Sequence, residues 1–159
     1  MTTSLVDTNV LIYSFDQRFP FKRRIARELL DQGSYEGSLA LAHQSIVEFV
    51  AVASRARPDL GGQSILPPDR ARLEAENFMM EFQIIYPDEQ VLKTALRGVS
   101  AYGLSWFDAH LWAYAEVNEL SEIYSDDFEH GRHYGSVRIV DPFLVATDAV
   151  HELPPMYAS

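Results

Sequence analysis

The chain has 159 residues, which is the size of one domain and leaves room for a substantial core. It contains no cysteine, so a disulfide framework, a thiolate metal site and a cysteine nucleophile are excluded. The net charge of −10 argues, taken alone, against a nucleic-acid partner.

Strand-like and helix-like segments alternate along the chain. Hydrophobic patterning predicts strands at 3–6, 38–42, 83–86, 122–124 and 137–140. It predicts helices at 9–15, 20–31, 44–54, 69–82, 88–102 and 105–118, with Gly33 placed after the end of the second. Residues 58–68 are rich in glycine and proline and are expected to form a loop.

This alternation predicts an α/β fold with a mostly parallel central sheet and helices on both faces. Such sheets bind ligands at the carboxyl ends of their strands. Asp7 directly follows the first strand, and Asp126 and Asp127 follow the strand at 122–124. The sequence therefore directs attention to acidic residues at one edge of the sheet.

Asp7 and Glu48 stand in apolar surroundings. Asp7, Thr8 and Asn9 follow one another, and one N-cap needs only one of them, so we favour a functional role for Asp7 over capping. Glu48 lies in a helix that is apolar on most of its surface, and it needs a partner there. A structural salt bridge and a metal ion explain Glu48 equally well.

Asp108 and the Asp126–Asp127 pair have simpler structural explanations when each is taken alone. Asp108 follows Ser105 by three residues, which is the spacing of a capping box. Asp126 and Asp127 are ordinary turn residues. Together, however, acids at the ends of four separate elements would repel one another without a cation. Oxygen ligands without cysteine favour Mg²⁺ or Mn²⁺ over Zn²⁺.

The histidines add little to this hypothesis. His43 precedes the helix of Glu48 and is interpreted as structural. The other four follow no pattern tied to the acids; they are His110, His130, His133 and His151.

Four stretches in order, "LVDTNVLIYSF", "QSIVEFVAV", "GLSWFDAHLWAYA" and "IYSDDFEHGRHYGSVRIVDPF", resemble the successive motifs of PIN-domain ribonucleases, and most of all the VapC toxins of bacterial toxin–antitoxin pairs. The resemblance covers about residues 4–143. It implies a three-layer α/β/α PIN-like domain over residues 1–143, followed by a tail, 144–159, of unknown role. Residues 55–72 match no motif, and Asp141 stands where relatives often have asparagine.

The resemblance also implies roles for particular residues. It identifies four catalytic and metal-binding acids, which are Asp7, Glu48, Asp108 and Asp127. Asp126 is expected to assist as a further metal ligand, and Thr8, Asn9 and Ser125 match polar positions that orient the acids or bound water.

By this resemblance the chain is an endoribonuclease that cleaves RNA phosphodiesters with water activated by Mg²⁺ or Mn²⁺. It is expected to be the toxin of a type II toxin–antitoxin system, to form a homodimer and to be held by an antitoxin protein. Two alternatives stay open. A phosphate-ester hydrolase of the haloacid-dehalogenase type would need a second aspartate where Asn9 stands, and a non-catalytic acidic metal-binding module would need no reaction.

The charge distribution permits an RNA partner despite the net charge. Residues 1–80 carry 9 Lys and Arg against 10 Asp and Glu, whereas residues 81–159 carry 4 against 13. Four basic side chains are candidates to hold the RNA backbone, namely Lys22, Arg23, Arg24 and Arg27. No signal-peptide pattern is visible and acidic or histidine residues interrupt the apolar stretches, so we expect a cytoplasmic protein without a membrane span.

Overall fold

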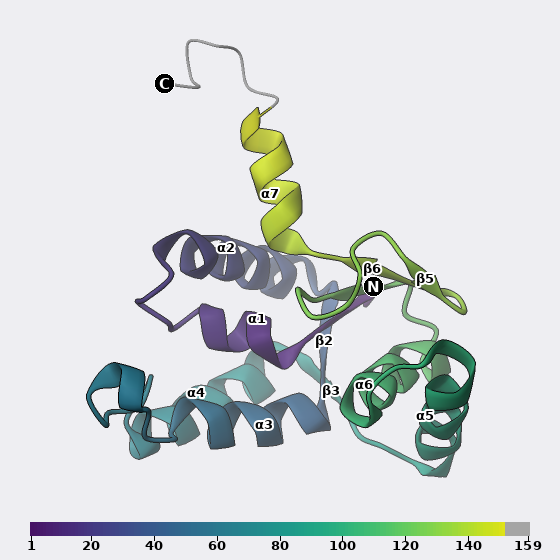
Figure 1. Cartoon of the computed structure of the whole chain (residues 1–159), viewed down its shortest axis with the longest axis horizontal. Helices are drawn as coiled ribbons and strands as arrows, with labels where there is room; N and C mark the ends of the chain where they lie inside the picture. The colour runs from purple at the N-terminus through teal and green to yellow at the C-terminus, as the bar shows by residue number, and fades with distance from the viewer. Residues whose placement is uncertain (152–159) are drawn as a thin grey trace.

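Six strands form one sheet in the order β3-β2-β1-β4-β6-β5 (Figure 1). The structure is a computed structural model that describes residues 1–151. The strands are β1 (Ser4–Val6), β2 (Leu39–Ala42), β3 (Gln83–Ile85), β4 (Glu122–Tyr124), β5 (His133–Tyr134) and β6 (Val137–Val140). All pairs are parallel except β5 with β6. The mostly parallel sheet is therefore confirmed, and β5, which has only two residues, was missed.

Helices cover both faces of this sheet. They are α1 (Thr8–Tyr13), α2 (Pro20–Glu36), α3 (His43–Ala53), α4 (Pro68–Glu81), α5 (Glu89–Tyr102), α6 (Trp106–Val117) and α7 (Pro142–His151), with a short 3₁₀ turn η1 (Pro58–Leu60). None of the helices in residues 1–151 is both long and apolar enough to cross a membrane.

The central strand β1 shows how the sheet divides the core. Successive side chains of a strand point to opposite faces, and Leu5 and Val6 are both fully buried. Leu5 packs in a cluster with Tyr114 of α6 and Ile123 of β4. Val6 packs in a second cluster with Phe49 of α3 and, from α4, Phe78. Figure 1 shows α1 to α4 on one side of the sheet and α5 with α6 on the other.

The predicted end of the second helix was wrong. Gly33 lies inside α2, which continues to Glu36 and ends at Gly37 with φ of +66°. A Cβ atom on Gly33 would lie 2.1 Å from Cδ1 of Leu39, so this glycine lets α2 pack closely on β2. The glycine reflects close packing of a helix on a strand, a long-range requirement that local patterning does not reveal.

The predicted start of the tail lies within a helix. Asp141 accepts hydrogen bonds from the backbone N–H groups of Phe143 and Leu144, at 2.9 and 3.3 Å, and so caps α7. The Phe143 ring packs edge-on against Tyr13, with 5.2 Å between the ring centroids. Helix α7 thus runs across the boundary expected at residue 143. Residues 152–159 of the tail lie outside the described part of the chain.

Candidate active site

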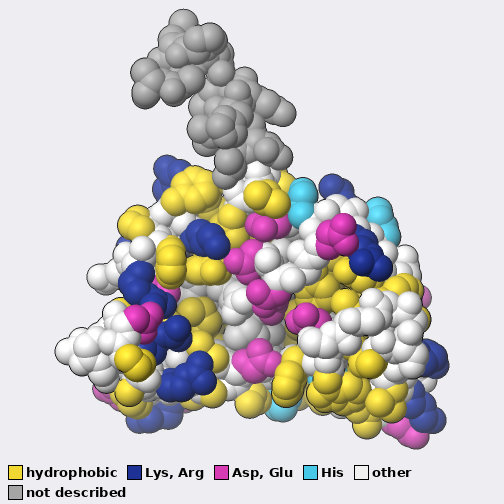
Figure 2. All heavy atoms as spheres, viewed as in Figure 1, with side chains coloured by type: hydrophobic (Ala, Val, Ile, Leu, Met, Phe, Trp, Pro, Cys, Tyr) yellow, Lys and Arg dark blue, Asp and Glu magenta, His cyan; other side chains and the backbone are white. Residues whose placement is uncertain are grey.

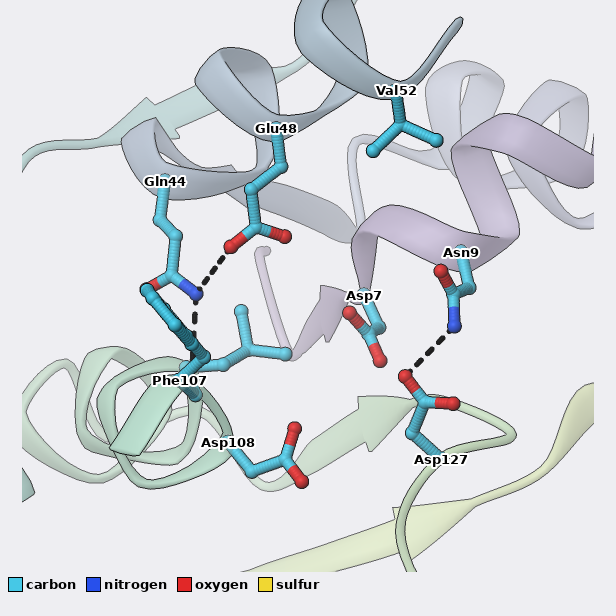
Figure 3. Close-up of a pocket in the computed structure, with 9 residues that line it drawn as sticks. Asp7, Asn9, Gln44, Glu48, Val52, Phe107, Asp108 and Asp127 are labelled. Atoms are coloured by element: carbon cyan, nitrogen blue, oxygen red, sulfur yellow. Dashed lines mark hydrogen bonds between the residues drawn. The ribbon is translucent and has the colours of Figure 1, made fainter. Parts of the chain in front are cut away.

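The carboxyl ends of β1 and β4 meet one face of α3 and the N-terminal end of α6 around a pocket of about 350 Å³ (Figure 3). All four acids named from the sequence as catalytic line it, namely Asp7, Glu48, Asp108 and Asp127. Figure 3 shows their side chains directed toward a common space from different elements. The sidewalls also include Asn9, Gln44 and Phe107, and no lysine or arginine is among the lining residues.

Asp7 is the deepest of the four acids. Its side chain makes no hydrogen bond that caps α1, so the capping explanation was wrong. Instead the Ser125 hydroxyl donates to Oδ2 of Asp7 over 2.6 Å. Asp7 is only 7% exposed, and its burial, reinforced by the charges of Asp127 and Asp108, raises its pKa to about 7.

Glu48 is held by neutral hydrogen-bond donors. The Thr8 hydroxyl donates to Oε2 at 2.9 Å, and the Gln44 amide donates to Oε1 at 2.8 Å. No lysine or arginine within residues 1–151 forms an ion pair with Glu48, so the structural salt bridge is not observed. The charge of Glu48 therefore faces the pocket uncompensated.

Gln44 and His110 were missed in the sequence as parts of this arrangement. Nδ1 of His110 lies 2.7 Å from Oε1 of Gln44. Because the Gln44 amide nitrogen donates to Glu48, its carbonyl oxygen must accept, and Nδ1 of His110 then carries the proton. Trp106 stacks on the His110 ring at 5.7 Å. Gln44 precedes Glu48 by one helical turn, which is the signal that could have found it.

Asp108 and Asp127 complete the set. Ser105 accepts a hydrogen bond from the backbone N–H of Asp108 at 3.2 Å, so the cap is formed, yet the Asp108 carboxylate lines the pocket. The Asn9 amide donates to Asp127 at 2.7 Å. Burial raises the pKa of both acids; the charge of Glu48 adds to this for Asp108, and that of Asp126 for Asp127. The charges of neighbouring carboxylates thus add to burial in raising the pKa of Asp7, Asp108 and Asp127.

Asp126, predicted to be a further metal ligand, lies outside this pocket. It pairs instead with Lys22, whose Nζ is 3.3 Å from Oδ2 of Asp126. The Lys22 ammonium also lies over the ring of Tyr13 at 4.5 Å. The adjacent acids Asp126 and Asp127 therefore point to different surroundings.

The basic residues expected to hold RNA are partly engaged within the protein. Besides Lys22, Arg27 donates from Nε to the backbone oxygen of Ser14 at 2.7 Å. The Arg24 guanidinium lies over the ring of Phe21. None of these basic side chains, Arg23 included, lines the acidic pocket.

The donor set suits a hydrated divalent cation. Within residues 1–151, no three carboxylate or imidazole groups lie close enough together to enclose a metal ion. Mg²⁺ usually keeps several waters and is bound in proteins through only one or two carboxylates, so a closed cage is not required. An open pocket of four carboxylates without a lysine or arginine provides the oxygen donors and the negative charge that such an ion needs.

Comparison with known proteins identifies the family of this fold. The family model of the PIN domain matches residues 4–136. No curated protein is similar enough to this chain to count as a match.

Several solved structures share the architecture. A toxin–antitoxin complex from Klebsiella pneumoniae is 21% identical, covers 88% of this chain and 98% of its own, and has a TM-score of 0.59. A DNA-bound VapBC from Salmonella typhimurium is 16% identical, with 89% and 99% covered and a TM-score of 0.65. The Mycobacterium tuberculosis toxin VapC20, described as cleaving the sarcin–ricin loop, is 14% identical, with 80% and 90% covered and a TM-score of 0.55.

Proposed function

Because this chain belongs to the PIN-domain family, we propose that it is a metal-dependent endoribonuclease, the VapC-type toxin of a toxin–antitoxin pair. One observation carries the proposal: Asp7, Glu48, Asp108 and Asp127 line a single pocket that no basic residue lines. The similar solved structures support the same function, because two are toxin–antitoxin complexes and one is a toxin described as cleaving the sarcin–ricin loop.

The side chains around the acids keep them in place for this reaction. The Ser125 hydroxyl donates to the Asp7 carboxylate and accepts from the backbone N–H of Asp127 at 3.0 Å, so one hydroxyl links two of the acids. Thr8 and Gln44 direct the Glu48 carboxylate, and Asn9 directs that of Asp127. When bound, Mg²⁺ or Mn²⁺ would offset the repulsion between the acids and the RNA phosphate and make water a stronger nucleophile.

An antitoxin would recognise the same pocket by charge. A guanidinium can donate two parallel hydrogen bonds to a carboxylate, so an arginine on an antitoxin tail matches the acids directly. The excess of acidic residues in the second half of the chain, 13 against 4, would speed the approach of a basic tail. Such a partner, encoded beside the toxin, would keep a cytoplasmic ribonuclease inactive.

A homodimer would cover the apolar surface of α5. Leu92, Leu96 and Val99 lie at helical spacing along one face and are 45%, 55% and 38% exposed. Phe107, on the rim of the acidic pocket, is 67% exposed. Contact through this surface would bring two acidic pockets into one assembly.

The two alternative functions have less support. Asn9 stands where a haloacid-dehalogenase-type phosphatase needs its second aspartate, and its amide is already committed to Asp127. A non-catalytic module would not require the carboxylates of Asp7, Glu48 and Asp127 to be oriented by four polar side chains.

The test is RNA cleavage by the purified chain in Mg²⁺, in Mn²⁺ and in EDTA, with a phosphate monoester assayed in parallel. We expect cleavage of RNA only with metal, 5′-phosphate ends, and growth arrest that the adjacent gene relieves. Monoester hydrolysis would support the phosphatase, and metal binding without any hydrolysis would support the binding module.

A further inference from the structure

Residues 55–67, which matched no motif, form a closed loop beside the acidic pocket. The backbone N–H of Arg57 donates to the carbonyl oxygen of Gln63 at 2.9 Å, and that of Gly62 donates to Arg57 at 2.8 Å. At the far end, the N–H of Leu66 donates to Ala53 in α3 at 2.9 Å. The loop is therefore a built element anchored to the helix that carries Glu48.

A second pocket of about 380 Å³ lies between this loop and the α1–α2 turn. We call it the loop pocket. Asn9 and Val52 line both the loop pocket and the acidic pocket, so the two are adjacent. An RNA chain whose phosphate lies at the acids would reach the loop pocket with a neighbouring nucleotide.

The charges of the loop pocket cancel one another. Arg18 donates to both carboxylate oxygens of Asp16, at 2.9 and 2.7 Å, and also to Asp59. Nε of Arg57 lies 3.5 Å from Oδ1 of Asp59 and makes no hydrogen bond with the described residues. Two arginines thus stand against two aspartates, which leaves no net charge to attract a phosphate.

The same groups suit the edge of a nucleobase. An arginine recognises guanine through O6 and N7, and a carboxylate accepts from base N–H groups. Phe19, which is 44% exposed and contacts Tyr13 edge-on at 5.8 Å, adds an aromatic ring of the kind on which unpaired bases stack. Asp59 is the most accessible of the four charged side chains at 55% exposed, and Arg57 at 29% has an Nε atom that makes no hydrogen bond with the described residues.

From this arrangement we propose that the loop pocket binds a base next to the cleaved phosphate and sets the sequence preference of the enzyme. Guanine matches the guanidinium and carboxylate best. The inference rests on the proposed ribonuclease function, which supplies the RNA. It assigns specificity to Arg57, Asp59 and Phe19, separately from the four acids.

The test compares cut sites in a random-sequence RNA pool for the wild type, Arg57→Gln and Phe19→Leu. Arg70→Gln is the matched control, because Arg70 pairs with Glu74 on the surface of α4 and does not line the loop pocket. We expect the wild type to favour guanine at one position beside the cut. Both test variants should flatten that preference and lower kcat/KM on the preferred RNA about tenfold or more, with little change on other sequences.

Two results would overturn the proposal. The first is a cut-site profile that both variants leave unchanged. The second is an equal loss on every sequence with a shallower salt dependence, which would show that Arg57 contacts phosphate.

Binding separates failure of this inference from failure of the proposed function. Short RNAs that differ in a single base are titrated against the Asp7→Asn variant, with and without Arg57→Gln. If the wild type cleaves no RNA, the ribonuclease proposal fails, and base-selective binding that Arg57→Gln removes would still support the loop pocket. Equal binding of all the short RNAs would overturn it.

Discussion

The two sides of the acidic pocket differ in chemistry. Dark-blue basic side chains gather over α1, α2 and the 55–67 loop in Figure 2, whereas a broad apolar area covers α5 and α6 on the lower right. On the charged side, Lys22 and Arg18 are already paired with aspartates. On the apolar side, Leu96 and Phe107 are more than half exposed. Because the charges on the first side are already paired, that side suits recognition of a polar ligand. The exposed apolar face on the other side indicates contact with another chain.

The largest effect on the cleavage rate is expected for Asp7, the most buried of the four acids in the pocket. Asp7→Asn keeps the shape of the side chain and removes its charge, so RNA cleavage should fall by about 10²-fold to 10³-fold or more. The rate in Mg²⁺ measures the loss, and an unchanged circular dichroism spectrum shows that the fold survives. Wild-type activity in this variant would refute the site assignment.

The same residue should make the metal-free protein less stable as the pH rises. The folded pKa of Asp7 is about 7, against 3.8 in its unperturbed state, so the folded chain binds more protons between these values and loses stability as the pH increases through them. In EDTA at pH 8, Asp7→Asn should raise the free energy of unfolding by at most about 4 kcal/mol, and by little at pH 4.

Thermal melts across this pH range, with and without Mg²⁺, measure the difference. Mg²⁺ should restore much of the wild-type stability at pH 8. A variant that is less stable than the wild type at both pH values would contradict the burial of an uncompensated carboxylate.

The apolar side is tested by Leu96→Glu, which places a charge on the exposed face of α5. We expect this change to weaken the proposed dimer about 100-fold, because a charge at the centre of an apolar interface is costly. Sedimentation across a dilution series measures this, and Lys93→Gln on the same helix is the control, since Lys93 forms only a surface pair with Glu89. A wild type that is monomeric at every concentration would assign this face to another partner.

A smaller effect is expected from the support of Glu48. Gln44→Leu removes the amide that orients this acid, and His110→Phe removes the group that orients the amide. Both should lower Mn²⁺ affinity or kcat about tenfold, as losses of supporting groups around metal ligands do. Gln90→Leu is the matched control. The Gln90 amide, like that of Gln44, donates a hydrogen bond to a side chain one helical turn later, here Thr94, but Gln90 does not line the acidic pocket. Equal losses in the control would reduce Gln44 to a helix-stabilising residue.

The smallest effect on the cleavage rate is expected for Asp126, which pairs with Lys22 on the charged side. Asp126→Asn should change the cleavage rate only slightly and reduce stability by about 1 kcal/mol, the value of a partly exposed ion pair. Asp127→Asn should instead lower the cleavage rate nearly as much as Asp7→Asn does. The reverse ranking would show that Asp126 turns into the pocket when RNA and metal bind.

Local patterning predicted the elements of this fold well, because alternating apolar segments and end signals act over a few residues. Helix α5 (Glu89–Tyr102) starts and ends within one residue of its predicted bounds, because Asp88 caps its start and Gly103 ends it. The pocket position of Asp7, Asp108 and Asp127 also follows from their place after a strand or at a helix start, whereas Glu48 lies in the middle of α3. What the sequence did not provide were contacts between distant elements. Gln44 with His110, Lys22 with Asp126, and Gly33 with Leu39 depend on tertiary packing that no short window of sequence contains.

The closed form of the 55–67 loop has a consequence for how this protein could diverge. Because its base is tied by Arg57, Gln63 and Leu66, the residues between can be exchanged or lengthened without disturbing α3 or the sheet. The four acids proposed to perform the chemistry lie outside this loop. If the loop pocket selects the base as proposed, a change in this one surface segment would alter the preferred RNA and leave the reaction intact.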